Sequence, residues 1–475
     1  MLERVFKIKE KGSTVRTEIV AGLTTFMTMA YIIALNPNML TGFDTGSPLW
    51  NGIFLSTCIA PAIGMLFMAF YANKPFALGP GMGLNAFFAS VATSVMAITG
   101  LTYLESYQAC LCIIFIEGVV FLILSIFNIR DKIIDAIPLG IRLGISPGVG
   151  LLLMNIGFGS NAGLYSENGG PFYMMRDFFG SLTPNFARDN MGSAYPNMVL
   201  NVSIAFICLF IIVVLSIKGI KGAMLLGMLA GCILYWICDF AILGQNPFAV
   251  LNGVSWVPAF GDWASTTLFK LNFANFLDMG IITALTLILS FGIIDMFDTI
   301  GTVIGAASLG GMLDKDGNMP GMKETLTSDA IATIAGALTG NCTITTFVES
   351  SAGVQAGGRT GLTALVCGIL FLACMFIAPV AALIPAAVTS AALVYVGILM
   401  VSALRNLDLT DMTQLVPAAL MLITIPISSS IGNAIGIAMI SFTVIKVFSG
   451  KAKEVHWLTY LVSLIFLVKF FLIVG

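Results

Sequence analysis

Apolar runs of membrane-spanning length fill almost the whole of this 475-residue chain. Hydrophobic residues make up 58% of it, charged residues only 10%, and its mean hydropathy is +0.99. A soluble domain carries about 25% charged residues. Within lipid every backbone polar group needs a partner in the protein, so runs of about 20 residues cross as helices. The chain is therefore predicted to be an all-α polytopic membrane protein.

The apolar runs form two sets of seven, separated by a polar stretch and followed by one extra run. The first set is Glu18–Asn36, Gly52–Tyr71, Ala86–Ile98, Tyr107–Phe127, Ile133–Gly157, Met198–Ile217 and Ala223–Ile242. The second is Gly280–Ile304, Asp329–Leu338, Thr346–Val354, Leu362–Ile384, Pro385–Val401, Met412–Ser428 and Ile431–Val447. The extra run, Trp457–Val474, is either a fifteenth span or a helix on the membrane surface, and Lys469 inside it favours the surface.

Two features repeat between the sets. An Ile-Pro pair, at Pro138 and again at Pro385, precedes a Val-Gly-hydrophobic-Leu motif at the same spacing. The third run of each set is short and follows a glycine-containing segment, Gly79–Gly83 in the first set and Gly340–Thr343 in the second. Short, interrupted runs at matching places are typical of a transporter binding site. An odd number of spans per half makes the two halves inverted repeats.

Basic residues indicate the orientation. The segment before the first span carries five lysines and arginines, and no signal-peptide cleavage site follows it, so the N-terminus is expected on the cytoplasmic side. The long loops Ser160–Pro196 and Gly244–Asp278 then lie on the outer side and are expected to contain interfacial helices.

Three carboxylates lie at membrane depth. Asp295 and Asp298 share one helical face in the eighth run, and Glu349 lies in the short tenth run. A charge there costs about 2.5–3.5 kcal/mol, and Arg142 is the one obvious basic residue inside the spans. These acids favour a substrate or proton site over a purely structural hydrogen bond, because a carboxyl group in a low dielectric takes up a proton more readily.

Other polar residues in the spans allow two interpretations. Asn85 offers two amide donors and an acceptor to a ligand, or it caps a helix. Gly83 and the neighbouring glycines permit close backbone approach. Glu117 is a structural hydrogen-bonding acid, the favoured interpretation, or a proton relay. The single histidine lies in the tail, no CxxC pair occurs, and the net charge is −2, so no metal, cofactor or nucleic-acid partner is expected.

Four motifs together resemble one family. They are Thr17–Phe26, Gly79–Phe88, Asp295–Thr302 and Thr345–Gly353, which read TEIVAGLTTF, GPGMGLNAFF, DMFDTIGT and TTFVESSAG. They are similar to those of the AzgA-like adenine, guanine and hypoxanthine permeases of the nucleobase–cation symporter-2 group, relatives of the uracil and xanthine permeases.

This resemblance implies a uracil-permease-like fold of fourteen spans in two inverted repeats, with broken helices and short extended segments at spans three and ten. It implies a homodimer in the plasma membrane that takes up a purine nucleobase with a proton by an elevator motion. The implied core domain is 1–128 and 244–384, the gate domain is 129–243 and 385–450, and 451–475 is an extra hydrophobic segment.

The resemblance also implies residue roles. Asp295 takes the place of the purine-binding acid of the eighth span, and Asp298, with Thr299, takes the supporting or proton-linked role. Glu349 and Asn85 match polar positions of the tenth and third spans. Phe87, Phe297 or Phe347 is expected to stack on the purine ring.

The alternatives to a purine permease are an anion transporter and an intramembrane enzyme. An anion transporter of the same fold requires a positive site, whereas the polar positions here are acids. An intramembrane aspartyl protease requires two aspartates that share a proton; we expect such aspartates to face each other from different helices, and here they lie on one.

Overall fold

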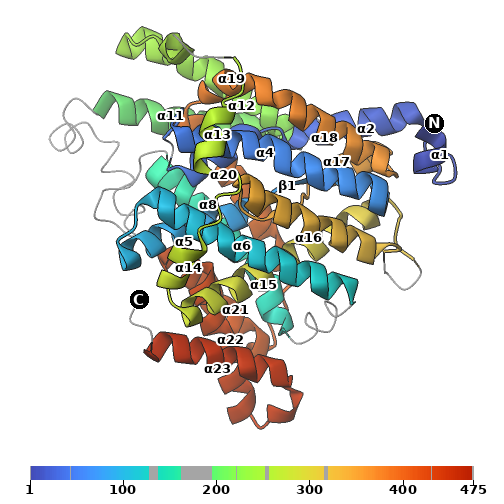
Figure 1. Ribbon diagram of the computed structural model, residues 1–475, viewed down its shortest axis with the longest axis vertical. Helices are drawn as coiled ribbons and strands as arrows, with labels where there is room; N and C mark the ends of the chain where they lie inside the picture. The colour runs from blue at the N-terminus through green and yellow to red at the C-terminus, as the bar shows by residue number, and fades with distance from the viewer. Residues whose placement is uncertain are drawn as a thin grey trace.

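A computed structural model of the protein describes residues 2–42, 44–127, 137–161, 195–220, 222–251, 256–314, 319–428 and 430–472. The helices and strand of the first half are α1 (Leu2–Phe6), α2 (Val15–Met29), α3 (Ile32–Leu40), α4 (Pro48–Phe67), β1 (Leu78–Pro80), α5 (Met82–Thr99), α6 (Tyr103–Ile126), α8 (Leu139–Ile156), α11 (Tyr195–Ile217) and α12 (Ala223–Cys238) (Figure 1).

The second half contains α13 (Phe260–Thr266), α14 (Phe273–Asp278), α15 (Ile281–Leu309), α16 (Met322–Thr339), β2 (Ile344–Thr346), α17 (Ser350–Gln355), α18 (Gly361–Ala373), α19 (Ala378–Ala382), α20 (Ala386–Val401), α21 (Met412–Ser428), α22 (Ile431–Phe448) and α23 (Trp457–Leu472). Single turns of π or 3-10 helix are η1 (Met68–Ala72), η2 (Gly157–Asn161), η4 (Asp239–Leu243), η5 (Pro247–Leu251), η6 (Cys374–Ile377), η7 (Ser402–Asn406) and η8 (Ala452–Glu454).

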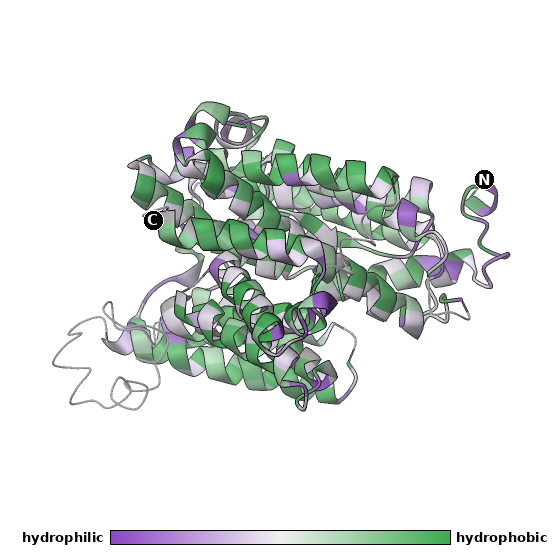
Figure 2. Cartoon of the chain, turned by 90° about the horizontal axis from the view of Figure 1, so that it is seen from below, coloured by the Kyte–Doolittle hydropathy of each residue, from purple (hydrophilic) through white to green (hydrophobic). Residues whose placement is uncertain are grey.

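The prediction of an all-α polytopic membrane protein is confirmed. Ten helical stretches in the described part of the chain are long and apolar enough to cross a membrane, and α20, α21 and α23 are shorter apolar helices. Hydrophobic residues run along most of the helices, and hydrophilic residues gather toward connections and chain ends (Figure 2).

The ninth predicted span was too short. The sequence indicated Asp329–Leu338, whereas α16 begins at Met322. The first turns of α16 are polar, but the hydroxyl groups of Thr325, Thr327 and Ser328 donate to carbonyls four residues back in the same helix. Each hydroxyl thus has a hydrogen-bond partner inside the helix, so this polar stretch can continue the helix. A hydropathy pattern does not take such bonds into account and therefore placed the start of the span too late.

The connection 244–278 contains η5, α13 and α14, and their place at the membrane interface stays a prediction. Trp263 of α13 donates through Nε1 to the carbonyl of Thr339 at 2.7 Å, and Asp262 accepts from Asn51 at 2.8 Å. α13 is therefore anchored to the ends of α16 and α4. Most of the other outer loop, Ser160–Pro196, lies outside the described residues.

Two extended segments cross at the centre of the protein. β1 pairs antiparallel with β2, with Gly79 opposite Thr345, and the Phe347 N–H donates to the Ala77 carbonyl at 2.9 Å beyond the strand pair. A Cβ on Gly79 would lie 2.9 Å from the Phe347 ring, so this crossing requires a glycine. The strands satisfy each other's backbone at membrane depth, as non-helical backbone in a bilayer must. α5 and α17 leave the crossing in opposite directions.

Equivalent positions of the two halves meet. Pro138 and Pro385 each stand at the residue before a helix, α8 and α20, where a missing N–H costs nothing. α8 packs against α20, and a Cβ on either Gly150 or Gly397 would lie 2.5 Å from the other's carbonyl oxygen. This reciprocal contact between matching glycines is what two-fold related halves predict.

The helices pack in two groups. In one, α16 contacts α4 and α6, and α18 contacts α2 and α4; in the other, α8 contacts α20 and α21, and α11 contacts α12 and α20. α5 contacts α6 of the first group and α8 of the second. The contact with α8 is close, because a Cβ on Gly83 would lie 2.3 Å from Val149.

The last helix runs alongside a span. The hydroxyl groups of Ser463 and Thr443 lie 2.8 Å apart. The Phe466 ring packs directly on Gly436, since a Cβ on this glycine would lie 2.5 Å from the ring. These contacts order α23 antiparallel along α22, and α23 also contacts α15. This packing favours the fifteenth span over a helix on the membrane surface, and the choice between them stays a prediction.

Candidate functional site

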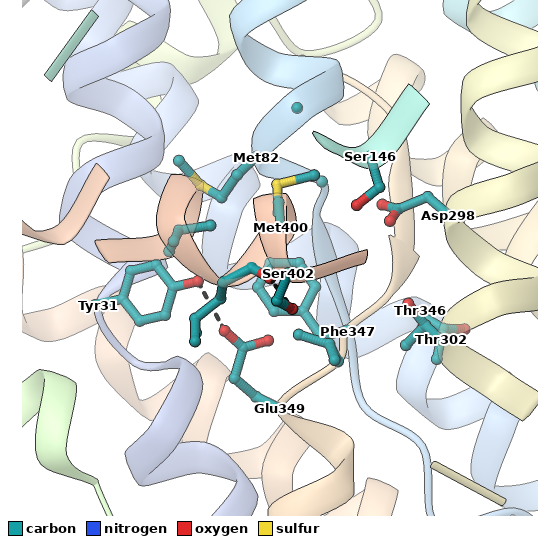
Figure 3. Close-up of a pocket in the computed structure, with 15 residues that line it drawn as sticks. Tyr31, Met82, Ser146, Asp298, Thr302, Thr346, Phe347, Glu349, Met400 and Ser402 are labelled. Carbon is teal, nitrogen blue, oxygen red and sulfur yellow. Dashed lines mark hydrogen bonds between the residues drawn. The ribbon is translucent and has the colours of Figure 1, made fainter. Parts of the chain in front are cut away.

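A cavity of about 370 Å³ lies beside the crossing of the two extended segments. It is lined by residues from β2, α5, α15, the segment before α17, α8, α20 and η7, and by Tyr31 between α2 and α3. The lining residues are Tyr31, Gly81, Met82, Gly83, Ser146, Asp298, Thr302, Thr346, Phe347, Val348, Glu349, Val396, Leu399, Met400 and Ser402 (Figure 3).

Glu349 enters the cavity from the residue that precedes α17 and is half-buried. The Tyr31 hydroxyl donates to its Oε1 at 2.9 Å. Tyr31 itself stands at the break between α2 and α3, which brings the first span into the site. A hydrogen bond to a carboxylate orients it, and the other oxygen remains available for an N–H donor.

Asp298 and Thr302 enter from α15, one turn apart on the same helical face. Asp298 is half-buried. A Cβ on Gly81 would lie 2.9 Å from the Thr345 methyl group and in ordinary contact with Asp298 Oδ2, at 3.7 Å. Asp298 and Ser146 lie on one side of the cavity, and Tyr31 and Glu349 on the other (Figure 3).

Asp295 lies behind the cavity and not on its lining. It is fully buried and accepts from Thr299 at 3.3 Å, and Thr299 in turn lies 3.0 Å from Asp329 and 2.6 Å from the Thr345 hydroxyl. Thr299 has a single O–H to donate, so it serves one of the two aspartates at a time. The resemblance assigned the purine to Asp295, whereas the geometry brings Asp298 to the cavity.

Asp329 is a further buried acid, which the sequence reasoning did not identify as a site residue. Its Oδ1 accepts from both the backbone N–H and the hydroxyl of Thr346, at 3.0 and 3.1 Å. It therefore fixes β2 from the side of α16. The available signal was an acid within a predicted span, as for Asp295, since Asp329 is the first residue of the predicted span Asp329–Leu338.

Asn85 belongs to a cluster of amides. It donates to Asn36 Oδ1 at 2.5 Å, and Asn36 donates to Thr57 at 2.7 Å and to Asn341 at 3.0 Å. This fully buried cluster joins α3, α4, α5 and the segment before β2. Asn85 is not among the lining residues, and its contact with a substrate stays a prediction.

The three aromatic residues that were expected to stack on the purine lie in different places. Phe347 lines the cavity, Phe87 packs on Phe291 with ring centroids 4.5 Å apart, and Phe297 is half-buried outside the lining. Gly83 lines the cavity as expected. Glu117 accepts from the Thr343 hydroxyl at 3.1 Å and lies elsewhere, at a second cavity. Within the described residues no group of three His, Cys, Asp or Glu is placed to hold a metal.

Several lining residues had no distinguishing signal in the sequence. Tyr31, Ser146 and Ser402 are ordinary residues of apolar segments, and only their neighbours in the fold place them at the site. Together the lining offers two carboxyls, five hydroxyl groups, two aromatic rings and the first backbone N–H groups of α5. Such a set suits a small, flat, neutral ligand with several N–H donors and ring acceptors.

Residues 16–439 match a family described as the permease family. A putative permease of Methanocaldococcus jannaschii is 36% identical over 100% of this chain and 99% of its own length. The adenine permease AdeP of Escherichia coli is 35% identical, over 99% and 96%. The guanine/hypoxanthine permease PbuO of Bacillus subtilis is 34% identical, over 99% and 100%.

Two solved structures share the fold. The transmembrane domain of the cyanobacterial bicarbonate transporter BicA matches with a TM-score of 0.62 at 14% identity, over 89% of this chain and 97% of that one. SLC26A9 matches with a TM-score of 0.61 at 12% identity, over 92% and 66%. At these identities the likeness concerns the fold.

Proposed function

This chain belongs to the permease family and is a membrane transporter, not an enzyme, and on that premise we propose that it carries a purine nucleobase through the cavity lined by Asp298 and Glu349. The observation that carries the proposal is the pair of carboxyls, Asp298 and Glu349, on opposite sides of a cavity that Phe347 also lines. The expected resemblance to purine permeases is confirmed at the level of the family.

The chemistry of the cavity supports a purine. Guanine and hypoxanthine present N–H donors along one edge, and carboxylates accept such bonds more strongly than neutral groups do. Phe347 offers a face on which a base can stack. The first N–H groups of α5, at Met82 and Gly83, have no partner within their own helix and suit the O6 and N7 acceptors.

We assign the substrate contact to Asp298 and Glu349, and a supporting role to Asp295. Asp298 is half-exposed to the cavity, whereas Asp295 is fully buried against Thr299. This reverses the roles that the resemblance implied for Asp295 and Asp298. Both aspartates remain part of the proposed site, together with Thr299 and Glu349.

Transport is proposed to be coupled to protons. The site contains acids and hydroxyls, and a carboxyl group at membrane depth can exchange a proton as the site opens to either side. The core domain is proposed to move against the gate domain. The packing of α16 with α4 and α6, and of α8 with α20 and α21, supports this division. We also propose that the protein lies in the plasma membrane with its N-terminus in the cytoplasm, and that it forms a homodimer.

An anion substrate is the second candidate, because the structures of similar fold include a bicarbonate transporter. The cavity argues against it, since its two ionisable lining residues are both acids. An anion would meet repulsion there instead of a counter-charge.

The test is uptake of radiolabelled hypoxanthine into proteoliposomes, with adenine, guanine, uracil and bicarbonate as competitors. Competition by the purines and none by bicarbonate is expected. A protonophore at constant external sodium should abolish accumulation. Uptake that follows the sodium gradient and ignores the protonophore contradicts proton coupling, and the absence of purine uptake by a folded protein contradicts the substrate.

A further inference from the structure

A carboxyl and a hydroxyl group from two different helices face each other in the transport cavity. Asp298 of α15 and Ser146 of α8 both line it, and their oxygen atoms point toward one another in Figure 3. α8 contacts both α15 and α5. A Cβ on Gly83 of α5 would lie 2.3 Å from Val149, which is one turn after Ser146 on α8. Asp298 and Ser146 therefore approach the same end of α5.

The hydroxyl groups of the cavity differ in what their protons do. Three donate within the protein: Tyr31 to Glu349 at 2.9 Å, Thr346 to Asp329 at 3.1 Å and Ser402 to the Leu399 carbonyl at 2.6 Å. Such a hydroxyl can only accept from a ligand. Ser146 and Thr302 make no hydrogen bond with the described residues, so their protons are available. Asp298 also accepts no bond within the described part of the chain, so both its oxygens face the cavity unoccupied.

We propose that Asp298 and Ser146 select guanine among the purines by binding the edge that carries N2, N1 and O6. This inference rests on the proposed function and names the preferred substrate of the same cavity. As a carboxylate, Asp298 accepts from the two neighbouring donors N2–H and N1–H, one at each oxygen, which is the strong bidentate arrangement. The Ser146 hydroxyl beside it donates to O6. Because O6 accepts two bonds, Ser146 does not compete with the first N–H groups of α5.

The other two purines match this pair less well. Hypoxanthine keeps N1–H and O6 but lacks the amino group, so one oxygen of Asp298 stays without a donor. Adenine has an acceptor at N1, whose lone pair meets a carboxylate oxygen, and it has no O6 for Ser146. A site built for an N–H donor rejects an analogue that lacks it strongly. Glu349, on the other side of the cavity, faces the imidazole N–H that all three bases share, so it does not discriminate between them.

The experiment measures equilibrium binding of radiolabelled guanine, hypoxanthine and adenine, each by itself, to the full-length protein in lipid nanodiscs. The Kd for guanine should be about tenfold lower than for hypoxanthine, because one bond to a charged group is added, and about a hundredfold lower than for adenine. 1-Methylguanine, which lacks N1–H, should displace guanine poorly.

The outcomes separate this inference from the proposed function. Tightest binding of adenine overturns the inference alone, since it would indicate a protonated Asp298, whose O–H and carbonyl match the adenine edge. Equal binding of guanine and hypoxanthine overturns it as well, because the amino group then has no partner. Absence of binding by all three bases to the folded protein overturns the proposed function together with the inference.

Ser146→Ala tests the second group of the pair. Guanine and hypoxanthine share O6, so both should bind about three- to tenfold more weakly, while adenine binding should stay within about twofold. Ser390→Ala is the matched control, because this serine of α20 donates to the Ala386 carbonyl at 2.8 Å and does not line the cavity. An equal loss for all three bases in Ser146→Ala would make this serine structural. A loss of guanine binding in Thr302→Val instead would give the O6 contact to Thr302, and either result overturns the proposal.

Discussion

The two segments that cross at the centre of the protein use their polar residues differently. In the first, Asn85 of α5 is fully buried and bonded to Asn36. In the second, Glu349 before α17 lines the cavity and is bonded to Tyr31. Both residues stand shortly after a strand of the same pair, and both come from the short third span of their half.

The difference teaches that a matching place in two repeats does not fix the role of a polar residue. Asn85 is fully buried and donates to the amide of Asn36. Glu349 accepts a hydrogen bond from the Tyr31 hydroxyl and lines the cavity. We therefore expect the first segment to serve stability and the second to serve the ligand, and four predictions separate these roles.

The largest effect is expected from Glu349→Gln. Glutamine keeps the shape but replaces a charge-assisted bond, worth about 1.5–3 kcal/mol, with a neutral one, so purine uptake should fall about ten- to a hundredfold. Uptake is measured in proteoliposomes at equal protein content, with fluorescence-detected gel filtration as the check on folding. Near-normal uptake by the well-folded variant would return Glu349 to a structural role.

The next effect distinguishes the two aspartates of α15. Asp298→Asn should weaken equilibrium purine binding about tenfold, because a half-exposed acceptor in the cavity loses its charge. Asp295→Asn should leave binding within about threefold and instead lower thermal stability, because it disturbs the Thr299 network. The converse pattern, with binding lost only in Asp295→Asn, would restore the assignment that the family resemblance implied.

Much of this architecture was predictable, and the reason is local chemistry. The start of α20 was predicted at Pro385, because the fixed backbone of proline suits the start of a helix, whereas the fifth span was predicted from Ile133 and α8 begins only after Pro138. The glycines around Gly79 predicted a break in the third span, because a side chain there meets Phe347. The acids at membrane depth indicated a site, because hydrocarbon penalises them.

The choice between the two aspartates was not predictable. Asp295 and Asp298 differ by three residues, which is about 60° around a helix. Only the neighbours decide which of two such positions is buried, and Thr345 and Asp329 come from elements more than 30 residues away. Tyr31 was missed for the same reason, since its partner Glu349 belongs to the other half of the chain.

A third, different effect is expected from Asn85→Ala. It leaves Asn36 with an unmet acceptor in a buried cluster, which costs about 1–3 kcal/mol of unfolding free energy. Thermal denaturation should occur at a lower temperature, while the folded fraction binds purine normally. Asn36→Ala should give a similar loss, and the double variant should lose less than the sum, because the two residues share one bond. Lost affinity with unchanged stability would place Asn85 at the substrate.

The smallest effect is expected from Tyr31→Phe, which keeps the ring and removes the hydroxyl that holds Glu349. Water in the cavity can replace the lost donor, so the cost should be about 0.5–1.5 kcal/mol, seen as a two- to tenfold rise in the KM for uptake. Tyr395→Phe is the matched control, because its hydroxyl contacts Ser216 at 2.6 Å, outside the lining of the cavity. In a Glu349→Gln background the Tyr31 change should have less effect, since the bond it removes is already weakened. Full additivity of the two changes would show that Tyr31 acts on the ligand directly and not through Glu349.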